Sequence, residues 1–203
     1  MPAGAQAINW HNAVLDNVVD SNGDMLDENY VFELGLFADG FIPVEGNVDQ
    51  WSSEWVVFDR SSFNPTLGYF SGTVQMLADG TSSSAAMTPG APSFADEMAY
   101  IWIRKGDAAV PGSEWLLLRD ESWVFPTAVD SCCGNSVPIE WAISDLNGGD
   151  VPEFGRQGGV EGPGVFTSTG AFDLQTGTFA IPEPSTLGLF VLASLGLLRR
   201  KRK

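Results

Sequence analysis

The chain has 203 residues, which suits one folded domain and a tail, and 44% of them are hydrophobic, which excludes a disordered chain. Its 23 glycines, 12 prolines and 11% aromatic residues are typical of a protein rich in strands and turns. The formal net charge is -16, and five of the ten cations stand together as Arg199, Arg200, Lys201, Arg202 and Lys203. The rest of the chain is strongly acidic and repels nucleic acid, so we exclude a nucleic-acid function.

Near the N-terminus, Ala5-Gln6-Ala7 has the small-x-small form of a signal-peptidase site. We expect residues 1–7 to be the remnant of a signal peptide and residues 8–178 to be the extracytoplasmic domain. Neither a basic region nor an apolar run stands before this site, so the alternative is a short leader of small residues. An apolar stretch encoded upstream would distinguish the two.

Short apolar runs separated by turn clusters predict a mostly β body, a single sandwich-like domain. The first two runs, residues 12–19 and 25–37, flank Asn22-Gly23, a dipeptide that favours a hairpin turn. Residues 80–93, rich in Ser, Ala and Pro, are expected to form an exposed loop. Later strands are expected over residues 69–77, 99–104, 115–119 and 139–143, with a final hairpin over 165–179.

One segment, residues 47–59, has a helical pattern instead. Trp51, Trp55 and Phe58 fall at positions i, i+4 and i+7, on one face of a helix. We therefore expect one short helix packed on the sheet by this aromatic face. Its start offers two candidate N-caps, Asn47 and Asp49.

Candidate catalytic residues are few. His11 is the single histidine, so a catalytic Ser-His-Asp triad or Cys-His pair would need it. The sequence has no G-x-S-x-G signature of a nucleophilic serine. The ordinary interpretation is a half-exposed residue on a first strand. The 26 acidic residues could supply the carboxylate pair of a glycoside hydrolase, although most must be solvated surface charges. We assign no catalytic residue.

The run Asp20-Ser21-Asn22-Gly23-Asp24 resembles a calcium-binding loop at first sight. It departs from the EF-hand pattern because Met25 stands where the glycine belongs and Val31 replaces the closing glutamate. A hairpin turn explains the same residues. Weak calcium binding there, or at Asp145-Asn147-Asp150, stays an alternative, and we expect no other metal or cofactor.

Seven tryptophans are many for this length. If they were exposed they could stack on sugar rings, as in a carbohydrate-binding module. We expect six of them in the core instead, two on the predicted helix face and four in apolar strands: Trp51, Trp55, Trp102, Trp115, Trp123 and Trp141.

The two cysteines, Cys132 and Cys133, are adjacent. A vicinal disulfide would stiffen a turn outside the cell but would be strained, because neighbouring Cα atoms lie only about 3.8 Å apart. The alternative is a turn with two unbridged thiols. Their spacing lacks the second ligand pair of a zinc site.

The C-terminal segment, residues 182–203, has three parts. Pro182-Glu183-Pro184 stays extended, because each proline restricts the residue before it. The basic cluster 199–203 ends the chain and fits the positive-inside rule. Between them lies an uncharged segment, shorter than the roughly 20 residues that cross a bilayer. A buried core helix is the alternative, but the cations favour a transmembrane helix formed by Thr186, Leu187, Gly188, Leu189, Phe190, Val191, Leu192, Ala193, Ser194, Leu195, Gly196, Leu197 and Leu198.

This order of a Pro-Glu-Pro motif, a hydrophobic helix and a basic end closely resembles the PEP-CTERM sorting signal of Gram-negative bacteria. The resemblance implies processing near Pro182-Glu183-Pro184 by an exosortase, a membrane transpeptidase-like enzyme. It also implies an inner-membrane-anchored intermediate, followed by the cell surface or the exopolysaccharide matrix.

The body is similar to that of an uncharacterised group of PEP-CTERM proteins of the Verrucomicrobia type, which implies a shared fold and no activity. The similarity rests on residues 32–51, 54–72, 99–103 and 114–126, which include FELGLFADG and EWLLLRDESWVFP. We expect an exported, non-enzymatic surface or matrix protein. The alternatives are a secreted carbohydrate-binding module, with polysaccharide as its partner, and a secreted glycoside hydrolase.

Overall fold

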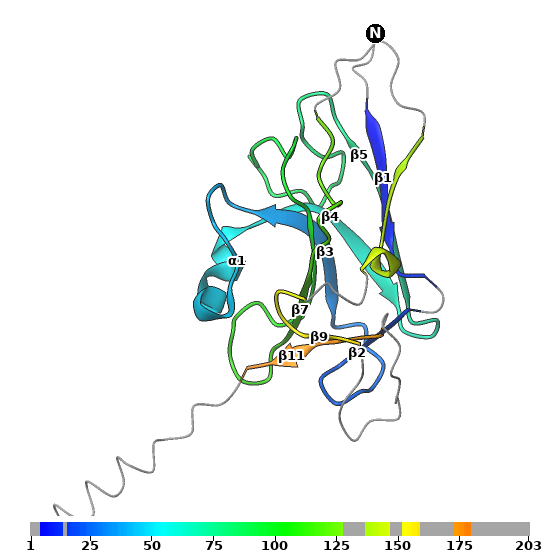
Figure 1. Ribbon diagram of the computed structural model, residues 1–203, viewed down its shortest axis with the longest axis vertical. Coiled ribbons are helices and arrows are strands. Elements are labelled where there is room, and N and C mark those ends of the chain that lie inside the picture. The colour runs from blue at the N-terminus through cyan, green and yellow to red at the C-terminus, as the bar shows by residue number, and fades with distance from the viewer. Residues whose placement is uncertain (1–4, 14–15, 128–136, 147–151, 159–172, 180–203) are drawn as a thin grey trace, which may run out of the picture.

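The computed structural model describes residues 5–13, 16–127, 137–146, 152–158 and 173–179, and their fold is mostly β (Figure 1). The strands are β1 (Gln6–His11), β2 (Asn17–Val19), β3 (Val31–Phe37), β4 (Trp55–Asn64), β5 (Tyr69–Met76), β6 (Tyr100–Lys105), β7 (Glu114–Leu118), β8 (Ile139–Ala142), β9 (Arg156–Gln157), β10 (Asp173–Gln175) and β11 (Gly177–Thr178). The helical elements are η1 (Glu45–Gln50), α1 (Trp51–Glu54) and η2 (Ile143–Asp145).

Eight of the strands form one curled sheet in the order β11-β7-β6-β3-β4-β5-β1-β8. Its neighbouring strands are antiparallel, except that β8 runs parallel to β1. A smaller sheet, β2-β10-β9, lies at the foot of the view in Figure 1. The predicted mostly β class is confirmed, and its main layer is this one curled sheet.

The strands in the middle of the large sheet are buried on both faces. Along β3, Phe32 and Leu34 belong to the larger core, whereas Phe37 points to the other face, as the alternation of a strand requires. A second group of buried residues, here called the aromatic cluster, covers that other face beneath α1. It comprises Phe37, Trp51, Trp55, Trp102, Trp115 and Leu117.

The predicted helix over residues 47–59 is wrong in extent. The helical turns end at Glu54, and Trp55 already begins β4. Phe58 is buried, but in the larger core, on the opposite face of the sheet from Trp51 and Trp55. A bulge lies here, because Leu34 pairs with Asp59 and Gly35 with Val57, which leaves Phe58 as the extra residue. The three side chains therefore do not share one face, contrary to the prediction. The expected single short helix is α1.

The first predicted hairpin is also wrong in extent. Residues 20–24 form a tight turn, in which the Asp20 N–H donates to the Asp24 carbonyl at 2.8 Å and Gly23 has a φ of 86°. Beyond this turn, however, Val19 and Met25 form only an isolated bridge. The strands do not continue because β2 pairs with β10, while β3 starts six residues later, at Val31.

The final predicted hairpin does not form in the described part of residues 165–179. There β10 pairs with β2 and β9, whereas β11 pairs with β7 in the other sheet. Thr176 connects the two strands and fixes this change of sheet, because its N–H donates to the Val19 carbonyl at 3.0 Å.

The remaining predicted strands are confirmed within two residues at either end as β5, β6, β7 and β8. The segment 80–93 is a loop, as expected, but it is only partly exposed: Gly80 and Ser82 are buried and Met87 packs on the larger core. At the N-terminus, β1 begins at Gln6, two residues before the expected start of the domain, and Gln6 is buried.

In the part of the chain that the structure describes, no helix has the length and apolar character needed to cross a bilayer. The expected transmembrane segment 186–198, the basic cluster 199–203 and Pro182-Glu183-Pro184 lie outside the described residues. Cys132 and Cys133 also lie outside them.

Candidate functional site

The C-terminal edge of the large sheet is formed by β11, which pairs with β7 through Gly177 opposite Trp115 and Thr178 opposite Glu114. The next residue, Phe179, packs against the aromatic cluster. Its ring lies edge-to-face on Trp115, with centroids 4.8 Å apart, and stacks on Phe154 at 5.0 Å. The body therefore holds the chain in place up to residue 179.

Gly177 is needed for this docking. A Cβ atom at this position would lie 2.7 Å from Cε1 of Phe154, closer than real Cβ contacts. Only a residue without a side chain lets β11 pass beside the Phe154 ring, so a local sequence requirement positions the whole C-terminal edge.

A pocket of about 630 Å³ opens beside β11. This volume lies within the range of small-ligand sites. Its walls come from four separate parts of the chain and are mainly polar: Ser21, Glu45, Pro152, Glu153, Phe154, Gly155, Arg156, Gln175, Thr176, Gly177 and Thr178. Glu153 is already paired, because Arg119 Nε lies 2.5 Å from its Oε1.

Glu114 lies behind two of the pocket residues and organises them. Its carboxylate accepts hydrogen bonds from the Thr176 hydroxyl and the Tyr30 hydroxyl, both at 2.6 Å, and from the Ser21 hydroxyl and N–H at 3.0 Å. Burial by itself would raise the pKa of Glu114, but the hydrogen bonds from Thr176, Tyr30 and Ser21 outweigh it and lower the pKa. Burial and the bond to Glu114 raise the pKa of Tyr30.

This arrangement sets the hydrogen-bonding character of the pocket. The hydroxyl groups of Ser21 and Thr176 donate their protons to Glu114. Their oxygens are therefore left to accept hydrogen bonds from a ligand. The Glu45 carboxylate adds further acceptors at the rim. With the Arg156 guanidinium in the same wall, the pocket lining contains both acceptors and donors of hydrogen bonds.

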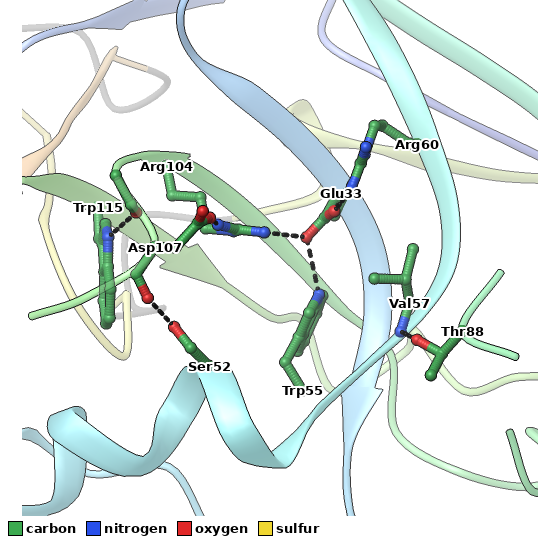
Figure 2. Close-up of polar contacts among 10 residues, drawn as sticks. Glu33, Ser52, Trp55, Val57, Arg60, Thr88, Arg104, Asp107 and Trp115 are labelled. Atoms are coloured by element: carbon green, nitrogen blue, oxygen red, sulfur yellow. Dashed lines mark hydrogen bonds and ion pairs between the residues drawn. The ribbon is translucent and has the colours of Figure 1, made fainter. Parts of the chain in front are cut away.

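A second polar group, on the aromatic-cluster side of the sheet, centres on Glu33 of β3 (Figure 2). Its side chain is fully buried, and Arg60 and Arg104 approach it from different sides, with Nη2 atoms 2.5 and 3.1 Å from its carboxylate oxygens. Trp55 Nε1 donates to Oε2 at 3.0 Å. Every oxygen of this carboxylate is occupied by the protein itself.

The Glu33 group also connects to the helix. Arg104 binds the Asp107 carboxylate, and the Asp107 carbonyl accepts a hydrogen bond from the Ser52 hydroxyl of α1 (Figure 2). The network therefore joins β3, β4, β6 and α1. Glu33 is fully buried, so the group joins these elements inside the body.

His11 lies on β1, as expected, and its side chain is 28% exposed. Nε2 lies 3.6 Å from a carboxylate oxygen of Glu140, and Nδ1 lies 3.2 Å from the Asn12 carbonyl oxygen. Among the described residues, no hydroxyl or thiol group forms a hydrogen bond with His11. The half-exposed position predicted from the sequence is confirmed.

The burial of the tryptophans contradicts the hypothesis that they form a surface on which sugar rings stack. The six expected in the core are buried, and so is Trp10; the most exposed of the seven, Trp55, is 8% exposed. The feature on which a tryptophan-based carbohydrate-binding module depended is therefore absent, because every tryptophan is inside the body.

The acidic turn at residues 20–24 is stabilised by the carboxylate of Asp20, its first residue. Asp20 Oδ1 accepts the N–H groups of Asn22 and Asp24, both at 2.9 Å, which explains the turn without a cation. Within the described ranges, no three His, Cys, Asp or Glu side chains are placed to hold a metal ion together. Asn147 and Asp150, the other calcium candidates, lie outside those ranges.

Sequence reasoning missed both carboxylates that organise the body. Glu33 could have been noticed, since a charged residue inside the apolar run FELGLF needs a buried partner. The pocket carried no such signal, because its residues come from segments as far apart as Ser21 and Thr178.

Residues 180–203 match the PEP-CTERM protein-sorting motif. The match begins directly after Phe179, the last residue that the structure describes, which packs on the body. No curated protein and no solved structure matches the chain. The chain thus carries a C-terminal signal for export and for processing by an exosortase-type enzyme, with a membrane-anchored intermediate.

Proposed function

We propose that this chain is a non-catalytic protein of the cell surface or the exopolysaccharide matrix, released there after an exosortase-type enzyme has processed its C-terminal segment. The observation that carries the proposal is the sorting motif over residues 180–203. The described strands all lie before this motif, so cleavage near Pro182-Glu183-Pro184 would leave them in place. The acidic surface of the body supports solubility after release.

Three of the carboxylates that the body holds in place, Glu114, Glu153 and Glu33, support a structural rather than a hydrolytic role. A glycoside hydrolase needs one carboxylic acid that keeps its proton near neutral pH. Glu114, beside the pocket, has the opposite property, since its hydrogen bonds lower its pKa. Glu153 in the pocket wall is held by Arg119, and Glu33 is out of reach of any substrate.

The test is intact mass spectrometry of the protein recovered from the envelope and the culture matrix of the native host. The proposal expects a species that ends near Pro182-Glu183-Pro184 in the matrix or outer-surface fraction. A chain that keeps Arg199 to Lys203 and occurs only in membranes contradicts it. The matched control replaces Pro182 and Pro184 by alanine, which should leave the body folded and the tail attached.

A second function, binding of a saccharide, is favoured by the polar pocket beside β11 rather than by the tryptophans. Titration calorimetry with neutral monosaccharides and with oligosaccharides from the host matrix tests it. Binding should be lost when Thr178→Trp fills the pocket rim, and should persist in Thr66→Trp, an exposed substitution on the β4–β5 turn. Equal heats for both variants would remove the pocket from consideration.

A further inference from the structure

The distance between the body and the membrane segment is short. Only residues 180–185 separate Phe179 from Thr186, the first residue of the expected transmembrane helix. An extended chain spans at most about 3.6 Å per residue, so these seven steps cover roughly 25 Å. The headgroup region takes up about 5–8 Å of that length. The sorting motif is thus confined between a bilayer and a folded body.

A processing enzyme needs the motif and its flanking residues extended in its cleft. With β11 docked on β7, Phe179 is fixed between Trp115 and Phe154, only three residues before Pro182. On the other side, the apolar segment begins two residues after Pro184. The docked body therefore competes with the enzyme for the same short stretch of chain.

β11 has the features of a segment that opens locally. It consists of two residues at the edge of the sheet, pairs with one neighbour only, and has Thr178 exposed and Phe179 half-buried. Short edge segments of this kind open at a small fraction of the cost of global unfolding. Opening would stop at Thr176, whose N–H and hydroxyl are bound by Val19 and Glu114.

Beyond Thr176 the chain is held firmly. Asp173, Leu174 and Gln175 of β10 are at most 4% exposed, and they pair with strands on both sides. Release of residues 177–179 would lengthen the free chain to ten steps from Thr176 to Thr186, or roughly 36 Å. The gain of about 10 Å requires no change in the core.

We propose that residues 177–179 act as a latch with two alternative partners: β7 and the aromatic cluster in the closed body, and the processing enzyme once they have peeled away. The opening of this latch sets the rate at which the tail is removed. This inference rests on the processing step of the proposed function. Cleavage then follows the population of the open form, as for proteolysis after local unfolding.

The first experiment compares tail removal in envelope preparations of the native host for the full chain and two alanine variants. Phe179→Ala removes both ring contacts of the latch and should speed processing at least about fivefold. Phe63→Ala is the matched control, because this half-buried ring also stacks on a neighbour, Phe32 at 4.9 Å, but far from β11. Equal rates for wild type and Phe179→Ala would overturn the proposal.

The second experiment closes the latch covalently. Glu114→Cys and Thr178→Cys occupy opposed positions of β7 and β11, and the natural pair is removed by Cys132→Ser and Cys133→Ser. The oxidised protein should be processed at least about tenfold more slowly than the same protein after reduction. Because both forms lack Glu114, the comparison isolates the bond. Equal rates would show that the enzyme accepts the docked strand.

A measurement that does not involve the enzyme distinguishes the latch from the processing step. Amide hydrogen exchange on the full chain in nanodiscs should show Thr178 and Phe179 exchanging at least about tenfold faster than Gln175. Exchange as slow as that of β10 would overturn the latch. Failure of wild type and of the Phe179→Ala variant to lose their tails at all, with fast exchange at 178 and 179, would count against the processing step instead.

Discussion

Glu33 and Arg60 stand directly opposite each other in the register of β3 and β4, and Arg60 Nη2 lies 2.5 Å from Glu33 Oε1. The carboxylate end of this pair is fully buried, whereas the Arg60 side chain is 52% exposed. Arg104, the second partner of Glu33, is only 12% exposed. The negative charge of Glu33 in the middle of the sheet is thus compensated by two cations, the half-exposed Arg60 and the mostly buried Arg104.

Removal of the Glu33 charge should strongly destabilise the protein. Glu33→Gln removes the charge that Arg104 and Arg60 share, while Arg104 keeps Asp107 as a carboxylate partner, so we expect the free energy of unfolding to fall by about 1.5–3 kcal/mol. Urea unfolding followed by circular dichroism measures it. Glu140→Gln is the control, because that side chain is 57% exposed and its pair with His11 should contribute less than about 1 kcal/mol. Similar losses for both variants would contradict the assigned role.

Gly35 should tolerate no side chain. A Cβ atom there would lie 2.3 Å from the Val56 carbonyl oxygen, a backbone atom that cannot swing away. Gly35→Ala should therefore cost about 1–3 kcal/mol, as other overpacked sites do. Gly46→Ala is the matched control, since nothing lies within 4 Å of its added carbon, and it should change stability by less than about 1 kcal/mol. Thermal denaturation of the two variants checks this, and an unchanged melting temperature in Gly35→Ala would refute the close approach.

The acid limb of the stability curve should depend on Glu114. Its pKa is lowered in the folded protein, so it contributes stability above its unfolded pKa of about 4.3 and loses it as the pH falls through the folded value. Between about pH 5 and pH 3 the wild type should therefore lose stability more steeply than Glu114→Gln. Melting temperatures measured across this range test the difference. The exposed Glu121→Gln serves as the control and should keep the wild-type slope.

The intrinsic fluorescence should report seven shielded indoles. All seven tryptophans are at most 8% exposed, so iodide should quench the native emission weakly and the unfolded emission strongly. Titration with saccharides should leave the native spectrum unchanged unless the ligand occupies the pocket. Strong quenching of the folded protein would show that at least one tryptophan is on the surface and would restore the stacking hypothesis.

The sequence predicted strands well where a short apolar run stands between turn residues, as in Tyr69–Met76 and Glu114–Leu118. It predicted burial of Trp102, Trp115, Trp123 and Trp141 from similar apolar runs, and all four are buried. The spacing of Trp51, Trp55 and Phe58 misled the helix prediction, because periodicity cannot distinguish a helix from a turn followed by a strand that is buried on both faces.

Long-range pairing could not be derived from the sequence. Nothing in the segments around Asn17 and Asp173 indicates that β2 and β10 lie side by side. The same is true of the pocket, whose walls are joined only once both sheets have formed. The sorting segment is the opposite case, because its three parts are contiguous and each has its own composition.

The pairing of β2 with β10 has a consequence for the order of folding. It joins Asn17 to Asp173. The pairing of β1 with β8 is similarly distant, because Ile8 pairs with Ile139. As the chain is synthesised, or emerges from a membrane N-terminus first, its earliest strands lack these partners for more than a hundred residues. Such non-local closure makes assembly slow and late. The body completes its fold only when the last strands have emerged, directly before the sorting motif of residues 180–203.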